Sequence, residues 1–276
     1  MNDSRVSRVA VLGAGTMGHG IAQTCAAAGI SVRVADVHEA ALDKGKLTAD
    51  DRDAQRARIA WGADIAAAVA DADLVIEAVP ERMELKKQLL ATVDAHAPEG
   101  ALVGSNTSSL SITELGNALK SPARLVGLHF FNPVPVMALL EIVRGIRTDE
   151  AAVDRALGFA AQIGKTPIVV RDMPGFATSR LGVALGAEAI RMLESGVASA
   201  EDIDRAMELG YRHPMGPLRL TDLVGLDVRL AILEHLHREV GEQFRPPTLL
   251  RQMVRAGKLG KKSGEGFYVW PAEGTK

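Results

Sequence analysis

A histidine and a glutamate in two neighbouring apolar segments are the residues of this chain best suited to acid/base chemistry. His129 follows the apolar residues 125–128, and Glu141 stands twelve positions later inside a second apolar run. Imidazole exchanges protons near neutral pH, and a carboxylate beside it fixes its tautomer and stabilises the imidazolium. A glutamate in such a run is rarely buried without a partner. We therefore predict that His129 is a general base oriented by Glu141; the alternative is a core histidine and a strand-edge glutamate.

A glycine-rich segment near the start of the chain predicts a dinucleotide-binding turn. An apolar strand at residues 9–12 leads into the pattern G-x-G-x-x-G, and a helical pattern then runs to Gly29, which is placed to cap that helix in the left-handed conformation. In this motif the first glycine makes a tight turn, the second lets the backbone approach the pyrophosphate, and the third allows close packing of helix on strand. The helix N-terminus then favours the anion.

A second strand, at residues 31–35, ends at Asp36. A carboxylate there can accept both ribose hydroxyls of NAD, whereas the 2′-phosphate of NADP would meet a negative charge. The predicted cofactor is therefore NAD; the alternative is a structural turn followed by a capping aspartate. The predicted cofactor contacts in this segment are Gly13, Gly15, Thr16, Met17, Gly18 and Asp36.

The composition of the chain excludes only a few classes of function. The chain has 276 residues and a formal net charge of −2, which gives no electrostatic reason to expect nucleic acid or an anionic membrane as a partner. No apolar run is long enough to cross a bilayer. Cys25 is the only cysteine, so an internal disulfide is excluded and a reducing cytoplasm fits.

Strand and helix patterns alternate up to about residue 170, which predicts an α/β chain with a Rossmann-like, doubly wound parallel sheet. Helical periodicity then takes over, so we expect an NAD-binding domain at residues 1–172 and a smaller all-α domain for substrate binding and dimerisation at residues 173–276. Ser111 and Ser199 predict helix starts. The later strands are predicted at residues 74–78, 101–105, 125–128, 140–143 and 167–170, and a helix at residues 83–96.

Five further motifs follow the glycine turn in a characteristic order: residues 77–81 (EAVPE), 105–109 (SNTSS), 129–133 (HFFNP), 174–176 (PGF) and 260–268 (GKKSGEGFY). Together they resemble the L-3-hydroxyacyl-CoA dehydrogenase family over nearly the whole chain. The resemblance implies reversible, NAD-dependent oxidation of an (S)-3-hydroxyacyl-CoA to a 3-ketoacyl-CoA, with a short acyl chain such as that of 3-hydroxybutyryl-CoA. It also implies a homodimer and an acyl-CoA substrate.

The resemblance assigns roles to several polar residues. Ser108 matches a serine that contacts substrate and nicotinamide, although it could instead cap a turn. Asn132 lies in the histidine motif, where it could serve substrate or only the turn before Pro133. Glu81, Lys86 and Lys262 match cofactor contacts; the alternative is that they are solvated surface charges.

Two positions depart from the family pattern. Ser179 stands where the family has a substrate-binding asparagine, and a hydroxyl has a shorter reach than an amide. After Asp36, members of the family continue into a long helical hairpin that contacts coenzyme A. In this chain the corresponding segment, residues 38–48, is much shorter, so most of the first arm of the hairpin is missing. We therefore assign no CoA-binding residue. The rival functions are dehydrogenation of a free hydroxy acid or sugar acid, and a catalytically silent NAD-binding scaffold.

Overall fold

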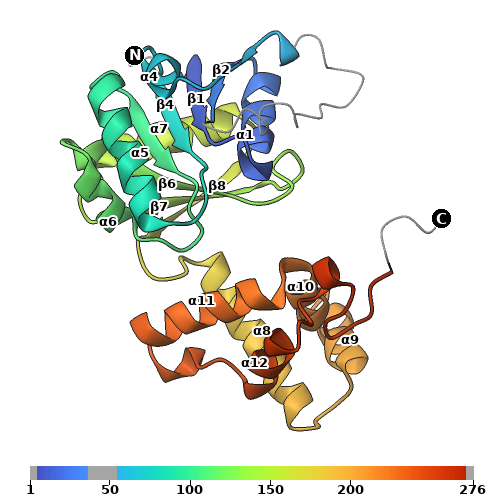
Figure 1. Ribbon diagram of the computed structural model, residues 1–276. Coiled ribbons are helices and arrows are strands. Elements are labelled where there is room, and N and C mark those ends of the chain that lie inside the picture. Colours follow the sequence, from blue (N-terminus) through green and yellow to red (C-terminus); the bar gives the residue numbers. More distant parts are fainter. Residues whose placement is uncertain (1–4, 37–54, 272–276) are drawn as a thin grey trace. The chain divides into compact units, whose positions relative to one another are not determined.

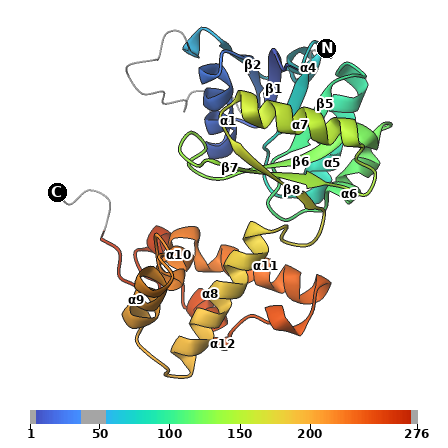
Figure 2. The same ribbon diagram turned by 180° about the vertical axis from the view of Figure 1, so that it is seen from behind.

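The computed structural model describes residues 5–36 and 55–271. The chain divides into two compact units, Met1–Met173 and Pro174–Lys276, and each is described by itself. Figures 1 and 2 show the chain from opposite sides.

The first unit is built on a sheet whose strands, among the residues described, lie in the order β3-β2-β1-β4-β5-β6-β7-β8. Each predicted strand is present, with ends that differ from the prediction by at most two residues. Strand β3 was not predicted, because Ile59 is its only buried residue and its sequence shows little apolar pattern. The strands are β1 (Arg8–Leu12), β2 (Ser31–Ala35), β3 (Ile59–Gly62), β4 (Leu74–Glu77), β5 (Leu102–Ser105), β6 (Leu125–Phe130), β7 (Leu139–Arg144) and β8 (Thr166–Arg171).

The doubly wound fold is as predicted, but the sheet is mixed where the sequence pattern predicted a parallel sheet. Strand β7 runs antiparallel to β6, while the other neighbouring strands pair in parallel. The physical reason is the length of the connection. Residues 131–138 are too few for the crossover of a dozen or more residues that joins parallel strands, but they suffice to join antiparallel neighbours.

Helices cover both faces of this sheet, as predicted for a doubly wound fold. Helices α1 and α7 share an apolar core that includes Ile21, Cys25 and Phe159, and they cover one face (Figure 2). Helices α4 and α5 contact each other and the central strands on the other face (Figure 1). Gly29 ends α1 with φ +81°, and burial raises the pKa of the Cys25 thiol to about 12. The helices are α1 (Thr16–Ala27), α4 (Ile65–Val69), α5 (Met83–His96), α6 (Ile112–Leu115) and α7 (Glu150–Gln162).

The parallel strands bring several polar residues to one edge of the sheet. Leu12 is in register with Glu77, Glu77 with Ser105, and Ser105 with Gly127. The strand order reverses direction at β1, with β2 on one side and β4 on the other. Ligands of open α/β sheets bind at such a switch point, outside the carboxyl ends of the strands.

The second unit is helical and has its own apolar core. Ser199 caps α9 by accepting a hydrogen bond from the Asp202 N–H (3.1 Å), as its sequence predicted. Near the end of the chain, the buried Asp222 carboxylate accepts hydrogen bonds from the backbone of Phe267 and Tyr268 and from the indole of Trp270. The helices are α8 (Thr178–Glu194), α9 (Ala200–Gly210), α10 (Pro217–Val224), α11 (Leu226–Glu239) and α12 (Thr248–Arg255).

Across residues 5–36 and 55–271, no helix is both long and apolar enough to cross a membrane. In the same ranges, no three His, Cys, Asp or Glu side chains gather in a way that could hold a metal ion.

Candidate active site

The turn between β1 and α1 has the geometry of a nucleotide-binding loop. Gly13 has φ +105°, and a Cβ there would lie 2.7 Å from the Ala78 carbonyl oxygen. A Cβ on Gly18 would lie 1.8 Å from the Gly13 carbonyl oxygen. Neither position can therefore carry a side chain without moving the backbone.

Gly15 differs from these two glycines because a Cβ there would meet nothing within 4 Å. It precedes Thr16, the first residue of α1, and both are exposed. No side chain caps this helix and no acidic residue lies in its first turn. The N–H groups of a first helical turn have no partner within the helix, so the open space at Gly15 and the helix start together suit a pyrophosphate.

Asp36 lies beside this turn at the end of β2. Its Oδ2 accepts a hydrogen bond from the Ala14 N–H at 2.7 Å, which fixes the carboxylate next to the glycine loop. Asp36 and Gly13 also line a cavity of about 230 Å³ whose other walls are mostly apolar. An apolar cavity with one carboxylate fits the adenosine half of NAD. The other lining residues are Leu12, Ala35, Ile65, Val79, Leu85, Gln88, Leu89 and Thr92.

His129 and Glu141 are brought together by the antiparallel pairing of β6 and β7. They are register partners, and His129 Nδ1 lies 2.6 Å from Glu141 Oε2. Glu141 is fully buried and His129 is 6% exposed. Because Nδ1 is bonded to the carboxylate, Nε2 is the nitrogen that can exchange a proton with a substrate.

Two sets of contacts hold the loop between β6 and β7 in place. Val134 is buried against α1, where a Cβ on Gly20 would lie 2.8 Å from the valine Cβ. The Lys165 ammonium donates to the carbonyl oxygens of Val134 (2.6 Å) and Met137 (2.7 Å). Asn132 lies in the same loop, before a cis peptide bond to Pro133, and is exposed.

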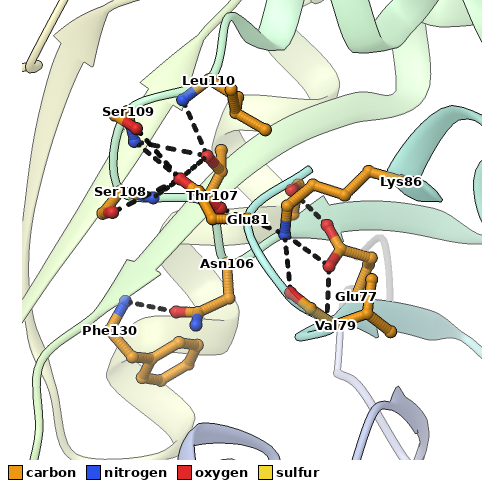
Figure 3. Close-up of polar contacts among 11 residues, drawn as sticks. Glu77, Val79, Glu81, Lys86, Asn106, Thr107, Ser108, Ser109, Leu110 and Phe130 are labelled. Atoms are coloured by element: carbon orange, nitrogen blue, oxygen red, sulfur yellow. Dashed lines mark hydrogen bonds and ion pairs between the residues drawn. The ribbon is translucent and has the colours of Figure 1, made fainter. Parts of the chain in front are cut away.

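Ser108 lies in a turn after β5 that surrounds the carboxylate of Glu81 (Figure 3). Lys86 is 1% exposed and pairs with both Glu77 and Glu81, so the alternative that Lys86 is a solvated surface charge was wrong. The tertiary reason is that the first turn of α5 packs over the end of β4, where the fully buried Glu77 supplies the opposite charge.

Sequence reasoning missed the roles of Glu77 and Asn106. Asn106 Oδ1 accepts a hydrogen bond from the Phe130 N–H at 2.9 Å, one residue after His129 (Figure 3). Glu77 is the last residue of the buried strand β4. Glu141 was identified because it is a glutamate within an apolar run, and Glu77 has the same kind of sequence context. Applied to both glutamates, this criterion would have pointed to a second buried charge.

Two predicted site residues lie in the second unit. Ser179 is the second residue of α8 and is half-buried. Lys262 is exposed and forms an ion pair with Asp227, with Nζ 2.6 Å from Oδ2. The shortened hairpin at residues 38–48 falls outside the residues that the structure describes.

Comparison with known proteins shows which family has this sequence. Residues 8–173 match the model of the 3-hydroxyacyl-CoA dehydrogenase NAD-binding domain, and residues 175–270 match that of the 3-hydroxyacyl-CoA dehydrogenase C-terminal domain. The chain is 43% identical to a 3-hydroxybutyryl-CoA dehydrogenase of Mycobacterium tuberculosis, over 98% of this chain and 100% of that protein. It is 41% identical to the human mitochondrial hydroxyacyl-coenzyme A dehydrogenase, over 96% of this chain and 91% of that protein.

A solved structure agrees with these relatives. The crystal structure of (S)-3-hydroxybutyryl-CoA dehydrogenase from Ralstonia eutropha superimposes with a TM-score of 0.92 at 41% identity, covering 97% of this chain and 100% of that one. The chain therefore belongs to the 3-hydroxyacyl-CoA dehydrogenase family and is an NAD-dependent oxidoreductase.

Proposed function

We propose that this enzyme oxidises (S)-3-hydroxyacyl-CoA thioesters of short chain length, such as (S)-3-hydroxybutyryl-CoA, to the 3-ketoacyl-CoA and catalyses the reverse reduction. The observation that carries the proposal is the 2.6 Å contact between His129 Nδ1 and Glu141 Oε2 at the carboxyl edge of the sheet. The names of the relatives from M. tuberculosis and R. eutropha support the acyl chain length.

In this mechanism His129 is the general base. Its Nε2 accepts the proton of the substrate 3-hydroxyl group, while the Glu141 carboxylate holds the Nδ1 proton and stabilises the imidazolium. Ser108 and Ser179 are the proposed donors to the substrate oxygen. When bound, NAD would supply the hydride acceptor. In the reduction, His129 returns its proton to the alkoxide oxygen.

The proposed cofactor contacts begin at the glycine turn and Asp36, where open space and a fixed carboxylate favour NAD. By resemblance to the family, Asn132 is a proposed substrate contact. The same resemblance makes three charged residues proposed cofactor contacts: Glu81, Lys86 and Lys262.

Replacing Asp36 by alanine should weaken NADH binding by about 10- to 150-fold, because hydrogen bonds to a charged group contribute roughly 1.5–3 kcal/mol. Asp36→Asn is the matched variant: its amide oxygen can still accept the Ala14 N–H, but it no longer repels a 2′-phosphate. We expect Asp36→Asn to bind NADPH more tightly than the wild type does. Fluorescence titration with both cofactors measures this, and a wild-type preference for NADPH would refute the assignment.

Replacing Ser179 by alanine should lower kcat/KM by about 2- to 10-fold if its hydroxyl donates to the substrate oxygen. Ser179→Asn, which introduces the family residue, should keep or modestly raise activity. Steady-state kinetics with acetoacetyl-CoA decides between them. An unchanged kcat/KM in the alanine variant would remove Ser179 from the site.

The substrate class is tested by comparing acetoacetyl-CoA with free acetoacetate in the direction of NADH oxidation. We expect the thioester to be turned over much faster, because the bound CoA portion positions the ketone. Equal or faster turnover of the free acid would favour the rival dehydrogenase of free hydroxy acids. Tight NADH binding without turnover of any 3-ketoacyl thioester would favour a silent NAD-binding scaffold.

We further propose that the enzyme is a cytoplasmic homodimer that needs neither nucleic acid nor a membrane. The family resemblance supports the dimer, as do exposed apolar side chains on the helices of the second unit, which include Leu181 of α8 and Leu209 of α9. The single cysteine, the buried Cys25, is compatible with a reducing cytoplasm. The net charge of −2 gives no electrostatic reason to expect nucleic acid or an anionic membrane as a partner.

A further inference from the structure

The loop between β6 and β7 touches the proposed general base directly. Phe131 is its first residue, and the ring of Phe131 packs against the imidazole of His129, with centroids 4.4 Å apart and planes inclined by 47°. Glu141 holds the same imidazole at Nδ1. The phenyl ring limits how far the imidazole can tilt about that hydrogen bond, because closely packed rings cannot move independently. The position of this loop therefore bears on where His129 Nε2 points.

The middle of the loop is a compact turn that can move as one piece. The N–H groups of Val136 and Met137 both donate to the Pro133 carbonyl oxygen at 3.0 Å. Beyond the turn, the Ala138 carbonyl oxygen accepts from the Thr166 N–H at 2.8 Å, at the start of β8. Bonds within the turn fix its shape, but they do not fix where it lies relative to the sheet. Contacts with other elements must do that.

A single ammonium group holds this turn from outside. Lys165 Nζ donates to the carbonyl oxygens of Val134 (2.6 Å) and Met137 (2.7 Å), which lie on either side of the turn. Lys165 is 8% exposed, and burial lowers its pKa. Both acceptors are neutral carbonyls, so burying this cation is more costly than burying an apolar side chain of the same length. The hydrogen bonds, rather than the aliphatic stem, explain why a lysine stands here.

The backbone of Lys165 is itself well fixed. Its N–H donates to the Ala160 carbonyl oxygen of α7 at 2.9 Å, and Gly164 before it has φ +69°. Thr166 after it begins β8 and is in register with Leu139 of β7. The ammonium therefore extends from a rigid junction between a helix and a strand, and it can serve as a fixed point for the loop.

We infer that Lys165 is a positioning residue of the active site: it holds the loop of residues 131–138 so that Phe131 packs against His129 and keeps Nε2 directed towards the substrate. The inference rests on the proposed role of His129 as general base. Lys165 acts through the loop and is assigned no contact with substrate or cofactor.

Replacing Lys165 by methionine keeps an unbranched side chain but removes both hydrogen bonds. We expect kcat with acetoacetyl-CoA to fall by about 10- to 100-fold, since a misplacement of about 1 Å can cost that much. The dissociation constant of NADH should change by less than about 3-fold, because the glycine turn and Asp36 are held by other contacts. Lys120 is an exposed lysine of the same unit, and Lys120→Met should change neither quantity.

A double-mutant cycle tests whether Lys165 acts through Phe131. Phe131→Leu removes the ring and leaves the Lys165 hydrogen bonds in place, and it should lower kcat by about 10-fold. Effects that pass through one contact do not multiply. The variant Lys165→Met/Phe131→Leu should therefore be within about 3-fold of the slower single variant. A lysine with a merely structural role would give losses that multiply.

Gly20→Ala displaces the same loop from another side and keeps the test decisive if Lys165→Met does not fold. A Cβ on Gly20 would lie 2.8 Å from the Val134 Cβ, so the valine must shift. We expect kcat to fall by about 10-fold. A Cβ on Gly100 would meet nothing within 4 Å, and Gly100→Ala should be fully active. Melting temperatures of all variants show whether a lost rate reflects unfolding.

Three results would overturn the inference: full kcat in a folded Lys165→Met enzyme, losses that multiply in the double variant, or full kcat in Gly20→Ala. Failure of the proposed function looks different. In that case the wild-type enzyme would not turn over acetoacetyl-CoA, or His129→Ala would keep its activity, whatever the Lys165 variants do.

Discussion

Replacing His129 by alanine is expected to lower kcat by about 10²- to 10⁴-fold, the usual loss for a general acid/base. The physical reason is that the fully buried Glu141 carboxylate holds His129 Nδ1 at this edge, which orients the imidazole and supplies a counter-charge for its protonated form. NADH affinity should stay near the wild-type value, since the glycine turn and Asp36 are separate from the dyad. Steady-state kinetics with acetoacetyl-CoA and NADH titration measure the two quantities.

A histidine elsewhere in the same unit is the control for this variant. His96 ends α5, is exposed, and its Nδ1 is hydrogen-bonded to the Thr92 carbonyl oxygen. His96→Ala should be fully active. A folded His129→Ala enzyme that kept most of its turnover would show that another group moves the proton.

Replacing Glu141 by glutamine should lower kcat by up to about 10⁴-fold, the loss seen when an amide replaces the carboxylate behind a catalytic imidazole. The amide cannot supply the counter-charge of an imidazolium, and it favours the wrong tautomer when its NH₂ group faces Nδ1. Because Glu141 is fully buried and glutamine has nearly the same shape, the strand should accept the change.

The double variant His129→Ala/Glu141→Gln distinguishes a dyad from two independent groups. Residues that act as a unit are strongly non-additive, so the double variant should be about as slow as His129→Ala alone. Independent effects that multiply in the double variant would contradict an orienting role for Glu141.

Much of the first unit could be predicted because its elements carry strong local patterns. Short β-branched runs marked the strands, the glycine fingerprint marked the first turn, and Gly29 marked the end of α1. The proximity of His129 and Glu141 was also predictable, because an acidic residue inside an apolar strand requires a partner.

The remaining features depend on register and packing that a linear pattern does not contain. Lys86 occupies a charged position in an amphipathic helix and resembles a solvated residue until Glu77 is placed beneath it. Likewise, the direction of β7 depends on the length of one loop, and β3 has almost no apolar signal of its own. Ser179 and Lys262 were identified by family resemblance, and their roles remain predictions.

The central claim is that hydride passes between NAD and C3 of a 3-oxygenated acyl-CoA at the edge where His129 lies. The most direct measurement is reduction of acetoacetyl-CoA by the purified wild-type enzyme with NADH carrying deuterium in the transferable position at C4 of the nicotinamide. We predict (S)-3-hydroxybutyryl-CoA with one deuterium at C3, and at least about 100-fold less of this product from the His129→Ala enzyme over the same time. Unlabelled product, the opposite configuration at C3, or no turnover by the wild-type enzyme would contradict the account.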